Sequence, residues 1–174
     1  MTAEEYIQLK AFARIDGALL SVMWTISFAL YVIGMANPMM MMGGFIIAVC
    51  SPVFAAMRVR KFRDNAREGV ISFGRAYTYT ILTFFYAALL FAIVQFVYFR
   101  FIDGGYMLSQ VMDLMSQDPN KQVIEAYGMT DTVNESIKLM AETRPIDYAV
   151  NYLSINMMLG MVLGLPIAAL TKRQ

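Results

Sequence analysis

Four long runs of apolar residues dominate the chain, at residues 17–35, 39–57, 76–99 and 148–170. None of the four runs contains Asp, Glu, Lys or Arg. A helix needs about 20 consecutive apolar residues to cross the hydrocarbon core of a bilayer, and buried helices of soluble domains are usually shorter. The pattern therefore predicts an all-α membrane protein with four transmembrane helices in a single integral membrane domain, residues 1–174.

The segment between the third and fourth runs, residues 100–147, has a helical pattern as well. In its first part, apolar residues recur at spacings of three and four and share one helix face: Leu108, Val111, Met112 and Met115. Two more short helices are predicted, one ending at Gly128 and one opened by a capping box, Thr132 to Glu135. We expect these short amphipathic helices to form a cap over the bundle, and an external partner on their apolar faces is the alternative.

Composition and charge add an orientation to this picture. Hydrophobic residues make up 59% of the chain and charged residues 16%, whereas an average soluble domain is roughly 45–50% apolar and 25% charged. Six basic residues lie between the second and third runs: Arg58, Arg60, Lys61, Arg63, Arg67 and Arg75. Basic loops are retained on the cytoplasmic side of a membrane. We therefore expect both termini to be cytoplasmic and residues 100–147 to lie outside.

The loop charges agree with that orientation. The predicted cytoplasmic segments hold ten basic and five acidic residues, and the outer segments hold four basic and eight acidic residues. A basic stretch can also bind nucleic acid through phosphates, but eighteen residues held between two spans cannot wrap a duplex. We expect contact with the lipid bilayer, and with another membrane protein or a second copy, but not with nucleic acid.

A glycine-containing motif follows the basic stretch and leads into the third run. It comprises Gly69, Ile71, Ser72, Phe73, Gly74 and Ala76. Together with the basic loop and the short basic tail, this motif resembles the domain-of-unknown-function family numbered 4199, small four-span proteins of Gram-negative bacteria. The resemblance implies four helices, an inner-membrane location and a periplasmic outer segment, but no activity.

From its residues alone, the motif is interpreted as a turn and helix cap that lead the chain into the third span. Gly69 and Gly74 permit turns that other residues resist, and Ser72 can cap the following helix. A loop that docks a small ligand or a partner is the alternative.

Three amides and a pair of glycines stand out within the apolar runs. Gln95, Asn151 and Asn156 need hydrogen-bond partners in a medium of low dielectric constant. We expect them to bond between helices, and a polar pocket for a small solute is the alternative. Gly160 and Gly164 lie one turn apart and allow close packing of the fourth span, either within the chain or against a second copy.

The residues for common catalytic and metal chemistry are few. The chain has no histidine and a single cysteine, Cys50, so the commonest general base and metal ligand is missing. We therefore predict no enzymatic activity and no cofactor. Sixteen methionines raise the alternative of a Cu(I) site, because thioethers suit that ion, although methionine also fills apolar cores.

The sequence favours a non-catalytic structural or interaction protein, an accessory component of the inner membrane. Coupled transporters place ionisable residues inside their spans, and the four apolar runs have none. The alternative is a component that passively transports or binds a small solute or a metal, including one that acts as an oligomer. The positions of Gln95, Asn156 and the methionine cluster discriminate between these two functions. A continuous polar or thioether-rich cavity favours transport, and pairwise packing between helices favours interaction.

Overall fold

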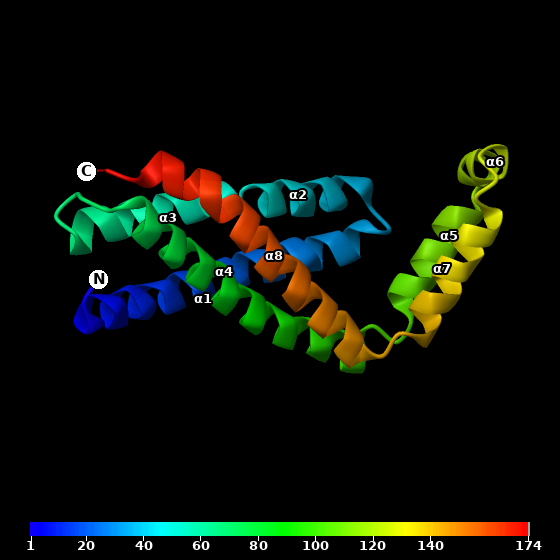
Figure 1. Cartoon of the computed structure of the whole chain (residues 1–174). Coiled ribbons are helices and arrows are strands. Elements are labelled where there is room, and N and C mark those ends of the chain that lie inside the picture. The colour runs from blue at the N-terminus through cyan, green and yellow to red at the C-terminus, as the bar shows by residue number, and fades with distance from the viewer. Residues whose placement is uncertain (174) are drawn as a thin grey trace.

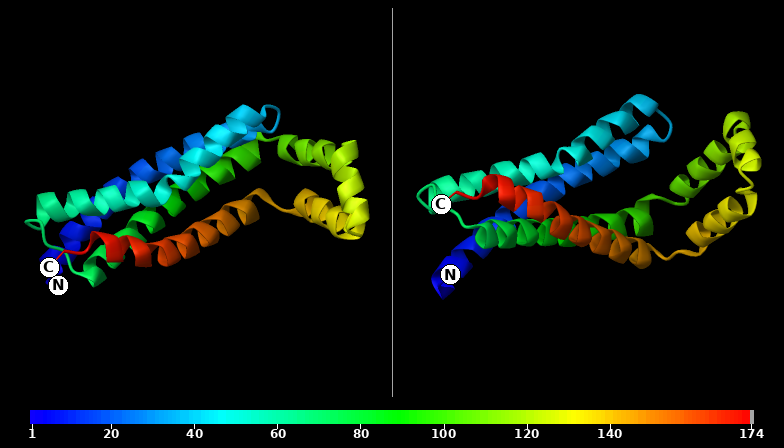
Figure 2. Two further views of the ribbon diagram at one scale, coloured as in Figure 1. Left: turned by 90° about the horizontal axis from the view of Figure 1, so that it is seen from above. Right: turned by 45° about the horizontal axis from the view of Figure 1, so that its top comes forward.

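The computed structural model describes residues 1–173, which are helical apart from short turns (Figure 1). Four helical segments are long and apolar enough to cross a membrane, as the four apolar runs predict. They are α1 (Ala3–Gly34), the consecutive α2 (Pro38–Val49) and α3 (Ser51–Ala66), α4 (Phe73–Val97), and α8 (Pro145–Thr171). Both termini lie at one end of the bundle (Figures 1 and 2). We call this the basic end and the opposite end the arm end.

Helix α4 is the centre of the bundle, because it packs along α1 on one side and along α8 on the other. Two glycines of α8 make the second contact close. A Cβ atom added to Gly160 would lie 2.5 Å from the Cβ of Phe84, and one added to Gly164 would lie 3.0 Å from the ring of Tyr77. The sequence-predicted glycine pair therefore seats α8 directly on α4 within the same chain.

The second span is interrupted between α2 and α3. Pro52 has no N–H group and cannot donate to the carbonyl of Ala48 four residues earlier. The Ser51 hydroxyl donates to that carbonyl instead, at 2.6 Å. A polar side chain thus satisfies the backbone group that the proline leaves free, as the bilayer requires.

Helix α1 begins at Ala3 and therefore extends well before the apolar run at residues 17–35. A capping box between Thr2 and Glu5 opens the helix and adds several turns before the apolar run. Asp16 consequently lies inside α1 and is only 2% exposed. An ionisable residue therefore lies inside α1 directly before the apolar run, near the basic end.

The Asp16 carboxylate is the centre of a polar cluster that joins three helices. It pairs with two guanidinium nitrogens of Arg58 on α3, with the Arg58 Nε donating at 2.6 Å. It also accepts a hydrogen bond from the Tyr79 hydroxyl on α4. We call Asp16, Arg58 and Tyr79 the ionic cluster. Every member is buried or half-buried, so the cluster fixes α1, α3 and α4 against one another.

The other basic residues of the stretch mostly tie the same end together. Glu5 accepts hydrogen bonds from Arg67 at 2.8 Å and from Arg75 at 2.6 Å. Arg63 donates to the carbonyl of Thr171 at 3.0 Å. Two residues of the stretch are instead exposed: Arg60 and Lys61.

The glycine-containing motif forms the turn that connects this network to α4. Gly69 has a φ of +83°, a conformation that glycine adopts without strain. Ile71 exchanges two backbone hydrogen bonds with Arg173, at 2.9 and 3.0 Å, so the motif binds the C-terminal tail. Ser72 occupies the N-cap position of α4, but within the described residues its side chain makes no capping bond. The remaining residues divide between the surface and the core: Phe73 and Gly74 are exposed, and Ala76 is buried.

The outer segment forms an arm beyond the bundle. A π-helical turn, η1 (Tyr98–Ile102), extends α4, and three short helices follow: α5 (Tyr106–Ser116), α6 (Asp118–Ala126) and α7 (Thr130–Glu142). These helices are as the sequence predicts, except that α7 starts before Thr132 without using the predicted capping box. They pack on one another and project past the arm end (Figures 1 and 2). The arm therefore does not form the expected cap over the bundle.

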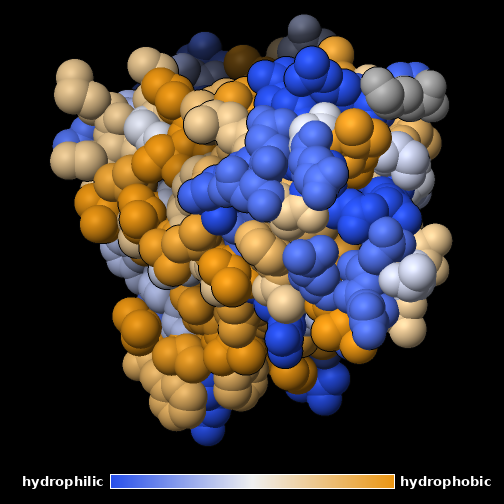
Figure 3. Space-filling model, turned by 90° about the vertical axis from the view of Figure 1, so that its left-hand side faces the viewer, coloured by the Kyte–Doolittle hydropathy of each residue, from blue (hydrophilic) through white to orange (hydrophobic). Residues whose placement is uncertain are grey.

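The surface of the bundle is apolar where the bilayer would cover it. Seen from the basic end, hydrophilic residues gather beside a broad hydrophobic surface (Figure 3). Side chains that point away from the core include large apolar ones on every span, and the most exposed are Met39, Phe45, Val162 and Leu170. Together with the four long helices, this surface makes the protein a multi-pass membrane protein.

Removing the Asp16 carboxylate should destabilise the bundle. Asp16→Ala leaves the Arg58 guanidinium without its partner in a half-buried site, and we expect a loss of about 3 kcal/mol, the lower end for a broken buried ion pair, because Arg58 is 22% exposed. Thermal unfolding of the detergent-solubilised variant measures the loss. Asp64→Ala is the control, since its partner pair with Arg63 is at the surface. An unfolding temperature for Asp16→Ala equal to that of the control contradicts a clamping role.

Candidate functional site: a lateral groove with a buried amide

A groove runs along one side of the bundle between α2 and α8. Helix α2 packs on α1 and α8 packs on α4, so α2 and α8 form the walls and α1 and α4 the floor. The groove has a volume of about 910 Å³. At the basic end, packing of α8 on α3 closes it. Its rim residues are open to the surroundings, with Phe45 67% and Leu159 45% exposed, so the groove faces the bilayer sideways.

The floor of the groove is aromatic and rigidly held. The Trp24 indole packs edge-on against Phe84 and Phe91, with ring centroids 5.7 and 5.8 Å away. Its Nε1 donates to the hydroxyl of Ser51 at 2.8 Å. Across the same floor, the Ser27 hydroxyl donates to the carbonyl of Gly44 at 2.7 Å. Both serines of the groove therefore hold helices together.

Gln95 is the exception among the polar groups of the groove. It lies near the end of α4, lines the groove, and is fully buried with an exposure of 0%. Within residues 1–173, neither its amide nitrogen nor its amide oxygen has a hydrogen-bond partner. The one further buried side-chain atom of this kind in that range is the Nε of Arg67, whose Nη2 is paired with Glu5. Gln95 alone leaves both a donor and an acceptor unused.

The neighbours of Gln95 do not supply these missing bonds. Asn156 also lines the groove, but its side-chain nitrogen donates to the Tyr152 carbonyl of its own helix at 2.8 Å. Asn151 is exposed and lies outside the set of residues that line the groove. The structure thus brings two of the three predicted amides to one groove, and the expected bonds between helices are not formed by Gln95 or Asn156 among the described residues.

The rest of the groove is apolar and uncharged. None of its lining side chains, all within residues 1–173, carries a charge. Met41 and Met42 contribute thioethers to its wall. The consecutive methionines at 39–42 point in successive directions, about 100° apart around α2, and Met39 is 82% exposed. These thioethers do not converge, so their arrangement gives no support to a Cu(I) site.

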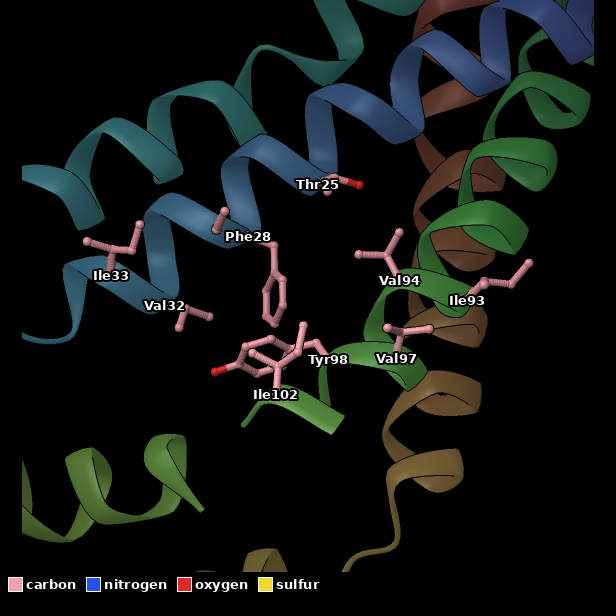
Figure 4. A pocket seen from close by; sticks show the side chains of 10 residues that line it. Thr25, Phe28, Val32, Ile33, Ile93, Val94, Val97, Tyr98 and Ile102 are labelled. Carbon is pink, nitrogen blue, oxygen red and sulfur yellow. The ribbon is translucent and has the colours of Figure 1, made fainter. Parts of the chain in front are cut away.

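A smaller hollow of about 410 Å³ lies between α1 and the end of α4 (Figure 4). Apolar side chains such as Val32 and Val94 line most of it. Its two hydroxyl groups are already bonded, that of Thr25 to the Ser21 carbonyl and that of Tyr98 to Asp103. This hollow therefore resembles an ordinary gap in packing. Among the described residues, the unpaired amide that a ligand could bond, that of Gln95, lines the larger groove instead.

Residues 16–173 match the family described as protein of unknown function (DUF4199). The chain belongs to this family. No curated protein and no solved structure matches the chain. The family description assigns no activity.

Asp16 and Trp24 are the structurally important residues that the sequence interpretation missed. A signal for both is present in the chain, because buried residues of α1 recur at helical spacings of three and four: Leu9, Ala13, Asp16, Leu20, Trp24 and Ser27. Asp16 falls on this stripe, and the periodicity therefore places the carboxylate on the core face of the helix.

Replacing Gln95 with leucine should stabilise the protein when the groove is empty. A buried amide without partners costs about 1–3 kcal/mol, and leucine of similar size removes that cost. We expect Gln95→Leu to raise the unfolding free energy of delipidated protein by about 1 kcal/mol or more, measured by thermal or denaturant unfolding in a mild detergent. Asn151→Leu, which changes an exposed amide of α8, is the matched control. A destabilised Gln95→Leu protein would show that the amide is in fact satisfied.

Proposed function

We propose that the protein is a non-catalytic inner-membrane protein that binds an amphiphilic molecule of the bilayer in the groove between α2 and α8. The observation that carries this proposal is Gln95, a fully buried amide without partners among the described residues, in a groove that is mostly apolar. A ligand that reaches the groove from the bilayer would bury its apolar part there and complete the bonds of the amide. The role is one of interaction, as an accessory binding protein.

The chemistry of the groove supports binding over catalysis. Its two serine hydroxyls already donate to backbone carbonyls, Ser27 to Gly44 and Ser51 to Ala48. A serine nucleophile requires a neighbouring general base, and the chain has no histidine to serve as one.

The same lining argues against passage of a polar solute. Apart from Gln95, Asn156 and a few hydroxyl groups, aromatic and aliphatic side chains line the groove. A solute that loses its hydration shell there regains few hydrogen bonds, and an unpaired polar group in an apolar site costs several kcal/mol. An amphiphile avoids this cost because most of its surface is already apolar.

For the orientation, we propose that the basic end is cytoplasmic and the arm periplasmic. Exposed Arg60 and Lys61 at the basic end would face the side on which basic loops are retained. The arm helices, in contrast, carry six acidic side chains and two lysines between residues 106 and 142.

Cysteine labelling tests this orientation. In a Cys50→Ala background, Leu139→Cys on the exposed side of α7 should react with a membrane-impermeant maleimide in spheroplasts. Lys61→Cys should react only after the membrane is permeabilised, because it would face the cytoplasm. The reverse pattern contradicts the proposed orientation and leaves the groove proposal unaffected.

Filling the groove should expel its ligand. Leu159→Trp adds bulk on the α8 wall of the groove, whereas Val162→Trp adds the same bulk on the outward side of α8 at a position that does not line it. We expect native mass spectrometry in mild detergent to find a stoichiometric amphiphile on the wild-type protein and on Val162→Trp. The Leu159→Trp protein should have lost most of it.

Two results would overturn the proposal. One is wild-type protein purified from its native membrane with no bound amphiphile. The other is equal retention by both tryptophan variants, which would place the bound molecule elsewhere on the surface.

A further inference from the structure

We propose that the groove selects an uncharged, single-chain amphiphile whose head group both donates and accepts hydrogen bonds, with Gln95 as the residue that recognises the head. A long-chain monoacylglycerol has this chemistry. The inference rests on the proposed function and adds to it the chemical class of the ligand. Three observations on the groove carry it: among the described residues, the lining has no charged side chain, the nitrogen and the oxygen of one amide have no hydrogen-bond partner, and the volume is that of a small-ligand site.

The first observation excludes charged head groups. The lining residues, all within the described chain, include no Lys or Arg that could pair with a phosphate or carboxylate and no Asp or Glu that could pair with an amine. An ion moved into such a site without a partner loses much of its solvation free energy. Phospholipids and ionised fatty acids therefore have to leave their heads outside the groove, where they cannot reach Gln95.

The second observation concerns the two halves of the Gln95 amide. Its NH₂ group offers two donors and its carbonyl accepts up to two bonds, and both atoms are unpartnered in residues 1–173. A head with acceptors alone, such as an ester or a quinone, would satisfy the nitrogen and leave the oxygen unpaired. A head with hydroxyl or amide groups can satisfy both, which is the strongest discrimination that a buried polar group provides.

The position of Gln95 sets the direction of the ligand. Gln95 and Tyr152 lie toward the arm end, where Tyr31 also lines the groove, whereas Pro52 and Leu163 line it toward the basic end. The tyrosines are amphipathic and suit the polar boundary of a membrane. The head would therefore sit in the leaflet at the arm end, with the chain extending over Trp24 toward Pro52.

The third observation, size, favours a small amphiphile over a protein helix. The volume of about 910 Å³ falls within the range of about 300–1,000 Å³ that encloses single small ligands. A transmembrane helix packed on the open side of the groove would have to bring a polar side chain to a fully buried amide.

Photolabelling with a diazirine-bearing monoacylglycerol of 16 to 18 carbons tests this inference on the full-length protein in nanodiscs. We expect the label on peptides of α2 and α8 that line the groove. Unlabelled monoacylglycerol should compete at least about tenfold better than its matched fatty-acid methyl ester, the free fatty acid or phosphatidylglycerol, since one well-placed hydrogen bond is worth about that factor.

The variants separate recognition of the head from occupation of the groove. Gln95→Leu should reduce monoacylglycerol labelling about tenfold and abolish the preference over the methyl ester, while Asn151→Leu should label like wild type. Because Gln95→Leu is expected to be more stable than wild type, lost labelling cannot be attributed to unfolding; the unfolding temperature of each labelled sample verifies this.

The outcomes distinguish the two proposals. If the methyl ester, the fatty acid or the phospholipid competes equally and Gln95→Leu labels normally, the head-group inference is wrong, while groove labelling that Leu159→Trp blocks would still support the proposed function. If wild-type labelling lies outside the groove or is insensitive to Leu159→Trp, both are wrong. Co-purification of a stoichiometric membrane protein crosslinked to the groove would likewise replace the lipid by a protein partner.

Discussion

Every polar group that this bundle takes out of water must find its hydrogen bonds inside the protein, because the hydrocarbon core offers none. Most polar side chains of the spans meet this demand within their own helix. Buried Thr80, Thr83 and Thr171 each donate to the carbonyl four residues earlier. Where a local solution is impossible, the bond crosses between helices, as with Trp24 and Ser51. The Asp16 carboxylate needs two partners, and its demand brings α1, α3 and α4 together.

Gln95 does not meet this constraint among the described residues, and the proposed ligand would meet it. The residue is as deeply buried as Thr80, yet among the described residues its amide makes no hydrogen bond, whereas the amide nitrogen of Asn156 donates to the Tyr152 carbonyl of its own helix. A leucine of similar size would remove the cost of the unpaired amide. The proposed ligand would instead complete the hydrogen bonds of the amide, and its binding would recover the free energy that folding leaves unused.

The sequence predicts the spans and the arm helices well because hydrophobic length and periodicity are local properties. It does not indicate that α1 extends before residue 17, since the charged residues there mark the end of an apolar run but not the end of a helix that Thr2 and Glu5 cap. Gln95 and Asn156 could be singled out as buried amides. That Gln95 would stay unpaired could not be foreseen, because the answer depends on how far α2 stands from α8, a distance set by tertiary packing.

The distance between α2 and α8 depends on how the helices are held at the two ends of the bundle. At the basic end, the ionic cluster, the pairing of Glu5 with Arg67 and Arg75, and the bridge from Ile71 to Arg173 join all four spans. Toward the arm end, α2 follows α1 while α8 follows α4. Hydrogen bonds thus hold the helices together where the chain is polar, and the walls separate where contacts are apolar. The proposed amphiphile would accordingly place its head at the arm end, because at the basic end α8 packs on α3.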